Sequence, residues 1–156
     1  MGIKYLCFVV FCAPMAKFFL LADDDHDDAD LFSEALTEID VTVDFLHVTD
    51  CPSLFKYLEN NSNRKPDIIF LDLNMPEMTG WECIEELKKK AYHQDIPVII
   101  YSTSSNQRDI DNAAKAKALG FVTKPNNYRI LVNLLNNIAA VDHTEIPRVL
   151  QDHARR

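Results

Sequence analysis

The stretch "KFFLLADDDHDD", residues 17–28, passes from a largely apolar run straight into a dense group of carboxylates. After Lys17 the run continues without a polar residue to Ala22, which predicts a strand that is buried on both faces. Carboxylates as close in sequence as those of residues 23–25 repel one another, and at the end of a buried strand a cation would neutralise them. A solvated, Asp-rich helix N-terminus needs no cation, so this stretch alone leaves both interpretations open.

The rest of the chain repeats the change from an apolar run to an amphipathic segment. The predicted elements are helices at about 27–39, after Cys51, after Gly80, at 107–120 with Gly120 as its C-cap, and from Tyr128, and strands at 17–22, 41–48, 67–71, 96–105 and 121–123. Five strands that alternate with five helices predict an α/β fold, in which helices cover both faces of a parallel sheet through right-handed crossovers. The strand at 41–48 alternates in polarity, which favours a sheet edge.

Composition restricts the class of protein. The chain has 156 residues, 47% hydrophobic and 26% charged, with a formal net charge of -8 and no long basic run, so direct nucleic-acid binding is not expected. No apolar run approaches the roughly 20 residues that span a bilayer, so membrane insertion is not expected either. The four cysteines, Cys7, Cys12, Cys51 and Cys83, lack metal-ligand spacing and are interpreted as reduced thiols of a cytoplasmic protein.

The two ends of the chain differ from the segment between them. Residues 1–16 resemble a weak signal peptide, yet Met15 stands directly before the first predicted strand. We interpret residues 1–16 as an N-terminal extension, for which a misassigned start codon is one explanation. The domain is expected at 17–140, followed by a tail at 141–156 that is loose or a short helical appendage because Pro147 interrupts it.

Polar side chains that could perform chemistry follow four of the five predicted strands. They are Asp23 and Asp24 after the first strand, Asp72 after the third, Ser102 and Thr103 after the fourth, and Lys124 after the fifth. Ligands of open parallel sheets bind outside the carboxyl ends of the strands, so these groups are expected to share one site. Carboxylate and carbonyl oxygens suit Mg²⁺. Asp72 could then attack a phosphoryl group that the Ser102 hydroxyl and Lys124 hold.

Four segments in the same order are similar to the response-regulator receiver domains of two-component signalling. They are "LADDD" (21–25), "DIIFLDLNMPEMTGWE" (67–82), "PVIIYST" (97–103) and "GFVTKP" (120–125), and the resemblance covers about residues 17–140. It implies a doubly wound, flavodoxin-like sheet of five strands in the order 2-1-3-4-5. It also implies a single-domain regulator that is not an enzyme and that receives phosphate from a histidine kinase or a phosphotransfer protein. Because few residues follow position 140, no output domain is expected.

The resemblance assigns roles by position. Asp72 would be the phosphoacceptor, and Mg²⁺ would be bound directly by Asp24, Asp72 and the backbone carbonyl of Asn74. Asp23 would act on the ion mainly through water. Asp25 lies outside this acidic pair and is expected to be an exposed residue that leads into the helix.

The family's switch would involve three further positions. Lys124 would pair with the phosphoryl oxygens or, without them, with Asp72, and the bond before Pro125 is commonly cis in the family. Ser102 would be the switching hydroxyl and Phe121 the switching aromatic, here without a phenolic hydroxyl. A target protein would read the surface of the fourth helix, fifth strand and fifth helix of a monomer or weak dimer.

Two other functions stay open at this point. A phosphatase of the haloacid-dehalogenase type also uses an aspartyl nucleophile with Mg²⁺, but it needs a second Asp two residues later, where this chain has Asn74. The alternative is a phosphorylation-independent, receiver-like protein-binding module. Such modules usually lack the acceptor, the acidic pair or the lysine, and this chain has all of them.

Overall fold

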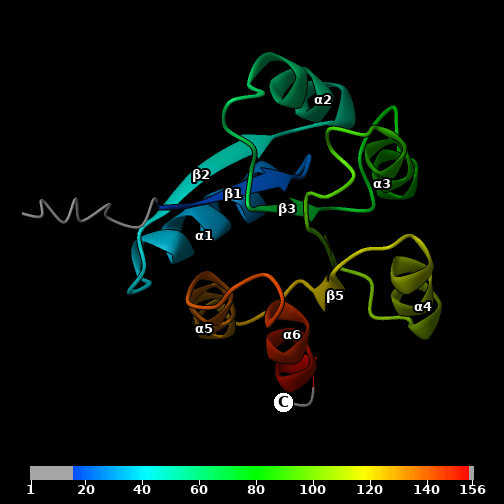
Figure 1. Cartoon of the computed structure of the whole chain (residues 1–156). Helices are drawn as coiled ribbons and strands as arrows, with labels where there is room; N and C mark the ends of the chain where they lie inside the picture. Colours follow the sequence, from blue (N-terminus) through cyan, green and yellow to red (C-terminus); the bar gives the residue numbers. More distant parts are fainter. Residues whose placement is uncertain (1–15, 155–156) are drawn as a thin grey trace, which may run out of the picture.

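A computed structural model describes residues 16–154, in which strands and helices alternate along the chain up to a final pair of helices (Figure 1). The strands are β1 (Lys17–Ala22), β2 (Val43–Val48), β3 (Ile68–Leu71), β4 (Val98–Ser102) and β5 (Gly120–Thr123). The helices are α1 (His26–Thr37), α2 (Cys51–Asn60), α3 (Gly80–Lys89), α4 (Gln107–Lys115), α5 (Tyr128–Ala139) and α6 (Ile146–Ala154).

The five strands form one parallel sheet in the order β2-β1-β3-β4-β5, which confirms the predicted fold. Side chains of α1, α5 and α6 pack on one face of the sheet, and those of α2, α3 and α4 pack on the other. Figure 1 shows α2 and α3 on one side of the strands, with α1 and α5 on the opposite side. The sheet is therefore covered on both faces, as the alternation of strands with helices predicts.

The apolar run that opens the fold supplies both hydrophobic cores. Phe19 and Leu21 belong to the core under α1 and α5, whereas Leu20 and Ala22 belong to the core under α2 and α3. Successive side chains of a strand point to opposite faces, so a strand with helices on both faces needs apolar residues at every position. β2 pairs only with β1 and is the predicted edge strand.

The prediction for Gly120 was wrong. The helix at 107–120 ends early, because α4 stops at Lys115 and Lys117 takes the left-handed conformation, with φ of 60°, that often ends a helix. The amide of Ala118 then donates a hydrogen bond to the Ala113 carbonyl at 3.0 Å. Gly120 is instead the first residue of β5. A Cβ atom there would overlap Cδ1 of Leu150, so this glycine makes room for α6.

The C-terminal segment packs against the domain as a helix. Ile146 and Leu150 are 1% and 6% exposed and belong to the core formed by α1 and α5. Pro147 stands in the first turn of α6, where its missing amide hydrogen breaks no helical bond, and so it does not interrupt the helix. Figure 1 shows α6 beside α5 and β5. It therefore covers part of the surface on which a target protein was expected to bind.

We expect Leu150→Ala to lower the free energy of unfolding by about 2–3 kcal/mol, because it leaves a cavity between α6 and β5. Urea denaturation followed by circular dichroism measures the change. Gln151→Ala is the control, since Gln151 is exposed on the same helix and its truncation should change little. Equal stability of the Leu150→Ala variant and the unmodified protein would show that α6 does not contribute to the fold.

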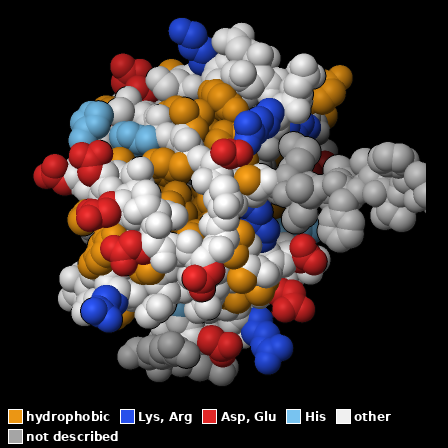
Figure 2. Space-filling view, turned by 90° about the vertical axis from the view of Figure 1, so that its left-hand side faces the viewer, with side chains coloured by type: hydrophobic (Ala, Val, Ile, Leu, Met, Phe, Trp, Pro, Cys, Tyr) orange, Lys and Arg blue, Asp and Glu red, His pale blue; other side chains and the backbone are white. Residues whose placement is uncertain are grey.

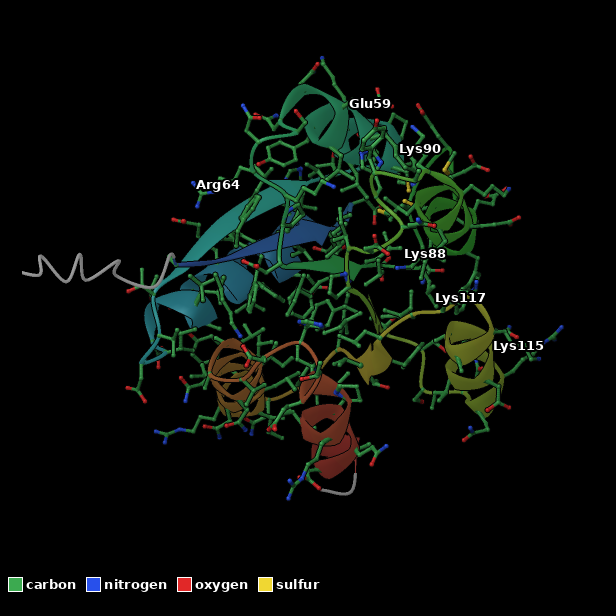
Figure 3. All side chains as sticks on the ribbon, in the orientation of Figure 1. Glu59, Arg64, Lys88, Lys90, Lys115 and Lys117 are labelled. Carbon is green, nitrogen blue, oxygen red and sulfur yellow. The ribbon has the colours of Figure 1, made fainter. Side chains whose placement is uncertain are left out.

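Several lysines join neighbouring elements. Lys90, just after α3, and Glu59 of α2 point toward each other (Figure 3) and form an ion pair at 2.7 Å. Lys88 donates hydrogen bonds to the carbonyls of Gln94 and Ile96 at 2.8 and 2.9 Å, which fixes the loop before β4. On the face in Figure 2, Lys and Arg side chains stand apart from one another, so that face carries no continuous basic patch.

Residues 1–15 of the predicted extension lie outside the described residues. They include Cys7 and Cys12. Cys51 and Cys83 are described, and both are buried free thiols in α2 and α3. Between residues 16 and 154, no helix is long and apolar enough to cross a membrane.

Candidate functional site

Three carboxylates meet where β1 and β3 end. The two strands are neighbours, and their register pairs Ala22 with Leu71, so Asp23 and Asp72 follow side by side. One oxygen each from Asp23, Asp24 and Asp72 lies within 4.8 Å of the others. Asp23 and Asp72 are buried, whereas Asp24 is exposed. This arrangement leaves the cluster open to solvent on one side, so that an ion could enter.

Backbone hydrogen bonds hold the two buried carboxylates in place. Oδ2 of Asp72 accepts from the Asn74 amide at 2.8 Å, and Oδ1 of Asp23 accepts from the Asp25 amide at 3.0 Å. The Asp72 amide itself donates to the Ala22 carbonyl at 2.9 Å, which joins the two strand ends. The positions of these carboxylates are therefore set by the backbone and depend little on side-chain rotamers.

Lys124, just after β5, brings a positive charge to this cluster. Its Nζ atom lies 2.7 Å from Oδ2 of Asp23, 2.8 Å from Oδ2 of Asp28 and 3.5 Å from Oδ1 of Asp72. Burial alone would lower the pKa of Lys124, but the hydrogen bonds and charges of these aspartates outweigh it and raise the pKa above its ordinary value. The side chain is thus a fixed cation.

The chemistry of the three carboxylates fits a divalent ion. Burial raises the pKa of Asp23, and the bonds from Lys124 and Asp25 offset this only in part. Oδ2 of Asp23 is buried and faces the Lys124 ammonium at 2.7 Å, and no other group of the described residues donates to it. Carboxylates this close repel one another, and a hard cation such as Mg²⁺ or Mn²⁺, which prefers oxygen ligands, would relieve that repulsion. Asp23, Asp24 and Asp72 can therefore hold a divalent ion.

The predicted hydroxyl lies at the same edge of the sheet. Ser102 is fully buried at the end of β4, where the Lys124 amide donates to its carbonyl at 2.7 Å. Its Oγ atom accepts from the Ser104 amide at 3.3 Å, and no hydrogen bond joins it to Asp72 among the described residues. Thr103 is exposed. Phe121 on β5 is partly buried and packs on the core under α3 and α4.

Two expectations about neighbouring residues have different outcomes. Asp25 is exposed and caps α1 by accepting from the amides of Asp27 and Asp28, which confirms its predicted place before the helix. The expectation of a cis bond before Pro125 was wrong, because all described peptide bonds are trans. A trans bond is the more stable form when the surrounding loop does not force the alternative.

Sequence reasoning missed two contacts of the site. Asp28 was not singled out, yet its carboxylate binds Lys124, and the His47 ring hydrogen-bonds the Asp23 carbonyl through Nε2 at 2.8 Å. The available signal for Asp28 was its position in the first turn of α1, three residues after the N-cap, which keeps it beside the strand ends. For His47, the pairing of β2 with β1 would have had to be known.

We expect Asp24→Asn to weaken divalent-ion binding by about tenfold or more, because it removes the solvent-facing carboxylate of the cluster. Calorimetric titration with Mg²⁺ measures the change. Asp30→Asn is the matched control, since it removes an equal charge from an exposed position of α1 and should leave the affinity within about twofold. A similar loss in both variants would mean that the ion responds only to overall charge.

Comparison with known proteins decides the family. The model of the response regulator receiver domain matches residues 19–136, which include all five strands except the beginning of β1. The chain belongs to the response regulator receiver family. It is thus a regulator of two-component signalling and not an enzyme in its own right, which argues against the phosphatase alternative. Receiver domains as a class are partners of histidine kinases.

Relatives of this receiver domain include proteins of similar and of greater length. Response regulator Rcp1 of Synechocystis is 27% identical over 126 residues, which cover 78% of this chain and 86% of Rcp1. The transcriptional regulatory protein KdpE of Staphylococcus aureus is 31% identical over 123 residues, which cover 77% of this chain and half (50%) of KdpE. The likeness to KdpE therefore concerns only part of that protein.

Solved structures share the receiver fold. The phosphorylated cyanobacterial phytochrome response regulator RcpA superimposes with a TM-score of 0.71 and 31% identity, over 79% of this chain and 91% of RcpA. The Mn²⁺-bound form of Rcp1 gives a TM-score of 0.69 and 26% identity, over 80% of this chain and 92% of Rcp1. Single-domain regulators that have been solved in phosphorylated and metal-bound forms are thus among the proteins similar to this receiver.

Proposed function

We propose that this receiver domain accepts a phosphoryl group on Asp72 in a Mg²⁺-dependent reaction and signals to a partner protein as a single-domain response regulator. The observation that carries the proposal is the meeting of Asp72 with two further carboxylates and the Lys124 ammonium at one sheet edge. The phosphorylated state of RcpA and the Mn²⁺ of Rcp1 support it by analogy. The donor would be the phosphohistidine of a histidine kinase or a phosphotransfer protein.

In this mechanism an oxygen of Asp72 attacks the phosphorus atom, a P–O bond forms, and the P–N bond to the donor histidine breaks. Lys124 stabilises the charge on the phosphoryl oxygens, and its raised pKa keeps it protonated. A bound Mg²⁺ would supply further positive charge to the same oxygens. Asp23, Asp24, Asp72 and the Asn74 carbonyl are its proposed ligands, and Asp23 would act mainly through water.

The switch would start at the strand ends. The phosphoryl group adds a charge of about -2, and the Ser102 hydroxyl would move to donate to one of its oxygens while Phe121 turns inward. The surface of α4, β5 and α5 would change with them and be read by a target protein. Because α6 packs against β5 and α5, the target would bind beside α6 or displace it. The free thiols of Cys51 and Cys83 support action in the reducing cytoplasm.

Incubation with acetyl phosphate and Mg²⁺, followed by phosphate-affinity gel electrophoresis, tests the function. We expect a shifted band that does not form when EDTA is present during the incubation. Acid or hydroxylamine treatment afterwards should remove the band, because both cleave an acyl phosphate. A protein that shows no shifted band under any of these conditions would instead be the phosphorylation-independent binding module. If the shifted band forms, pull-down with beryllofluoride-treated and with untreated protein would identify a partner that distinguishes the two states.

A further inference from the structure

The contact between Asp28 and Lys124 has no role in the mechanism above. Oδ2 of Asp28 receives a hydrogen bond from Nζ of Lys124 at 2.8 Å, while Oδ1 of Asp72 is 3.5 Å from the same nitrogen. Asp28 belongs to α1, and its side chain is 31% exposed, so it approaches the pocket from the solvent side. The lysine that is expected to stabilise the phosphoryl group is thus engaged mainly by other residues.

We propose that Asp28 is a positioning residue that competes with the phosphoryl group for Lys124 and so lowers the stability of the phosphorylated state. This inference rests on the proposed function. In the resting protein Asp28 holds the ammonium on the α1 side of the pocket. When Asp72 carries a phosphoryl group, Lys124 must divide its hydrogen bonds between the new oxygens and the Asp28 carboxylate.

The local charges give the direction of the effect. Three carboxylates surround the Lys124 ammonium, and Asp24 adds a fourth to the cluster. A phosphoryl group brings about two more negative charges, so the charge of Asp28 opposes it. The same charge attracts a divalent cation. Removal of the Asp28 charge should therefore strengthen binding of a phosphoryl-like anion and weaken binding of Mg²⁺.

A purely structural role predicts a different result. Asp28 lies in the first turn of α1, where a negative charge stabilises the helix N-terminus. If this were its only function, its replacement would loosen the start of α1 next to Asp23 and Asp24. Binding of the cation and of the anion would then both become weaker. The opposite signs of the two effects thus distinguish competition for Lys124 from helix stabilisation.

The test compares Asp28→Asn with Asp27→Asn. Asp27 lies in the same turn, is exposed and makes no contact with Lys124, so its replacement removes an equal charge without the ion pair. Mg²⁺ affinity is measured by calorimetry, and beryllofluoride affinity at saturating Mg²⁺ by ¹⁹F NMR. Asp28→Glu, which keeps a carboxylate within reach of the lysine, is the second variant. Circular dichroism confirms that each variant is folded.

We expect Asp28→Asn to bind beryllofluoride about three- to tenfold more tightly and Mg²⁺ about two- to fivefold more weakly. Asp27→Asn and Asp28→Glu should stay within about twofold of the unmodified protein. Unchanged affinities in Asp28→Asn, weakening of both, or equal effects in Asp27→Asn would overturn the inference while the proposed function stands. If the unmodified protein binds no beryllofluoride, the proposed function fails and the inference falls with it.

Discussion

Asp72→Asn should reduce phosphorylation by acetyl phosphate to the background of the assay. The amide has no anionic oxygen to attack phosphorus, and it removes a carboxylate from the proposed metal site. The variant should still fold, because loss of one carboxylate relieves repulsion within the cluster. The oxygen of the substituted side chain could also keep the hydrogen bond from the Asn74 amide, which now goes to Oδ2 of Asp72. Phosphate-affinity gels and intact mass measure the modification.

Asp30→Asn serves as the control for this experiment, since Asp30 is exposed on α1 and contributes the same charge. It should be phosphorylated like the unmodified protein. Phosphorylation that persists in Asp72→Asn would place the acceptor on another residue, and peptide mapping would then identify it. Such a result would contradict the assignment of Asp72 without contradicting membership of the receiver family.

Gly80→Ala should destabilise the protein by about 3 kcal/mol or more and remove divalent-ion binding. A Cβ atom at Gly80 would overlap the Asp72 carbonyl oxygen and come within 2.9 Å of the Leu73 Cα atom. Both neighbours are backbone atoms of the loop just after β3, so they cannot move aside without shifting Asp72 itself. The Gly80 amide also donates to the Leu73 carbonyl at 3.0 Å, and this bond fixes the close approach.

Gly120→Ala is the matched control. A Cβ atom at Gly120 would come as close to its nearest neighbour as one at Gly80, but that neighbour is a side-chain atom and not a backbone atom. There the neighbour is Cδ1 of Leu150, the end of a side chain that can change its rotamer. We expect a loss of only about 1 kcal/mol and unchanged ion binding. Urea denaturation and calorimetry measure both quantities. If Gly80→Ala were tolerated as well as Gly120→Ala, the geometry of the loop after β3 could not be what positions Asp72.

Local pattern predicted the framework of the site well. Apolar strands such as 17–22 are buried on both faces because helices cover both faces of the sheet. The side chains that follow the strands collect at one edge because the strands are parallel. The meeting of Asp23, Asp24 and Asp72 followed from this rule before any distance was known. Boundaries were less accurate. The helix was predicted to run to Gly120 because the Ala-rich sequence continues past Lys117, but Lys117 takes the left-handed conformation and α4 ends at Lys115.

The sequence by itself determined the order of strands and helices, the receiver motifs and the edge at which the acidic residues meet. Hydrophobic period is a property of short segments, and the alternation of strands with helices implies parallel strands whose carboxyl ends share one edge. Only the tertiary structure decided that Lys124 binds Asp28 in addition to Asp23, and that Leu150 of α6 packs over Gly120 of β5. These contacts join residues 96 and 30 positions apart, and no local periodicity encodes which side chain lies within a few ångströms of another after folding.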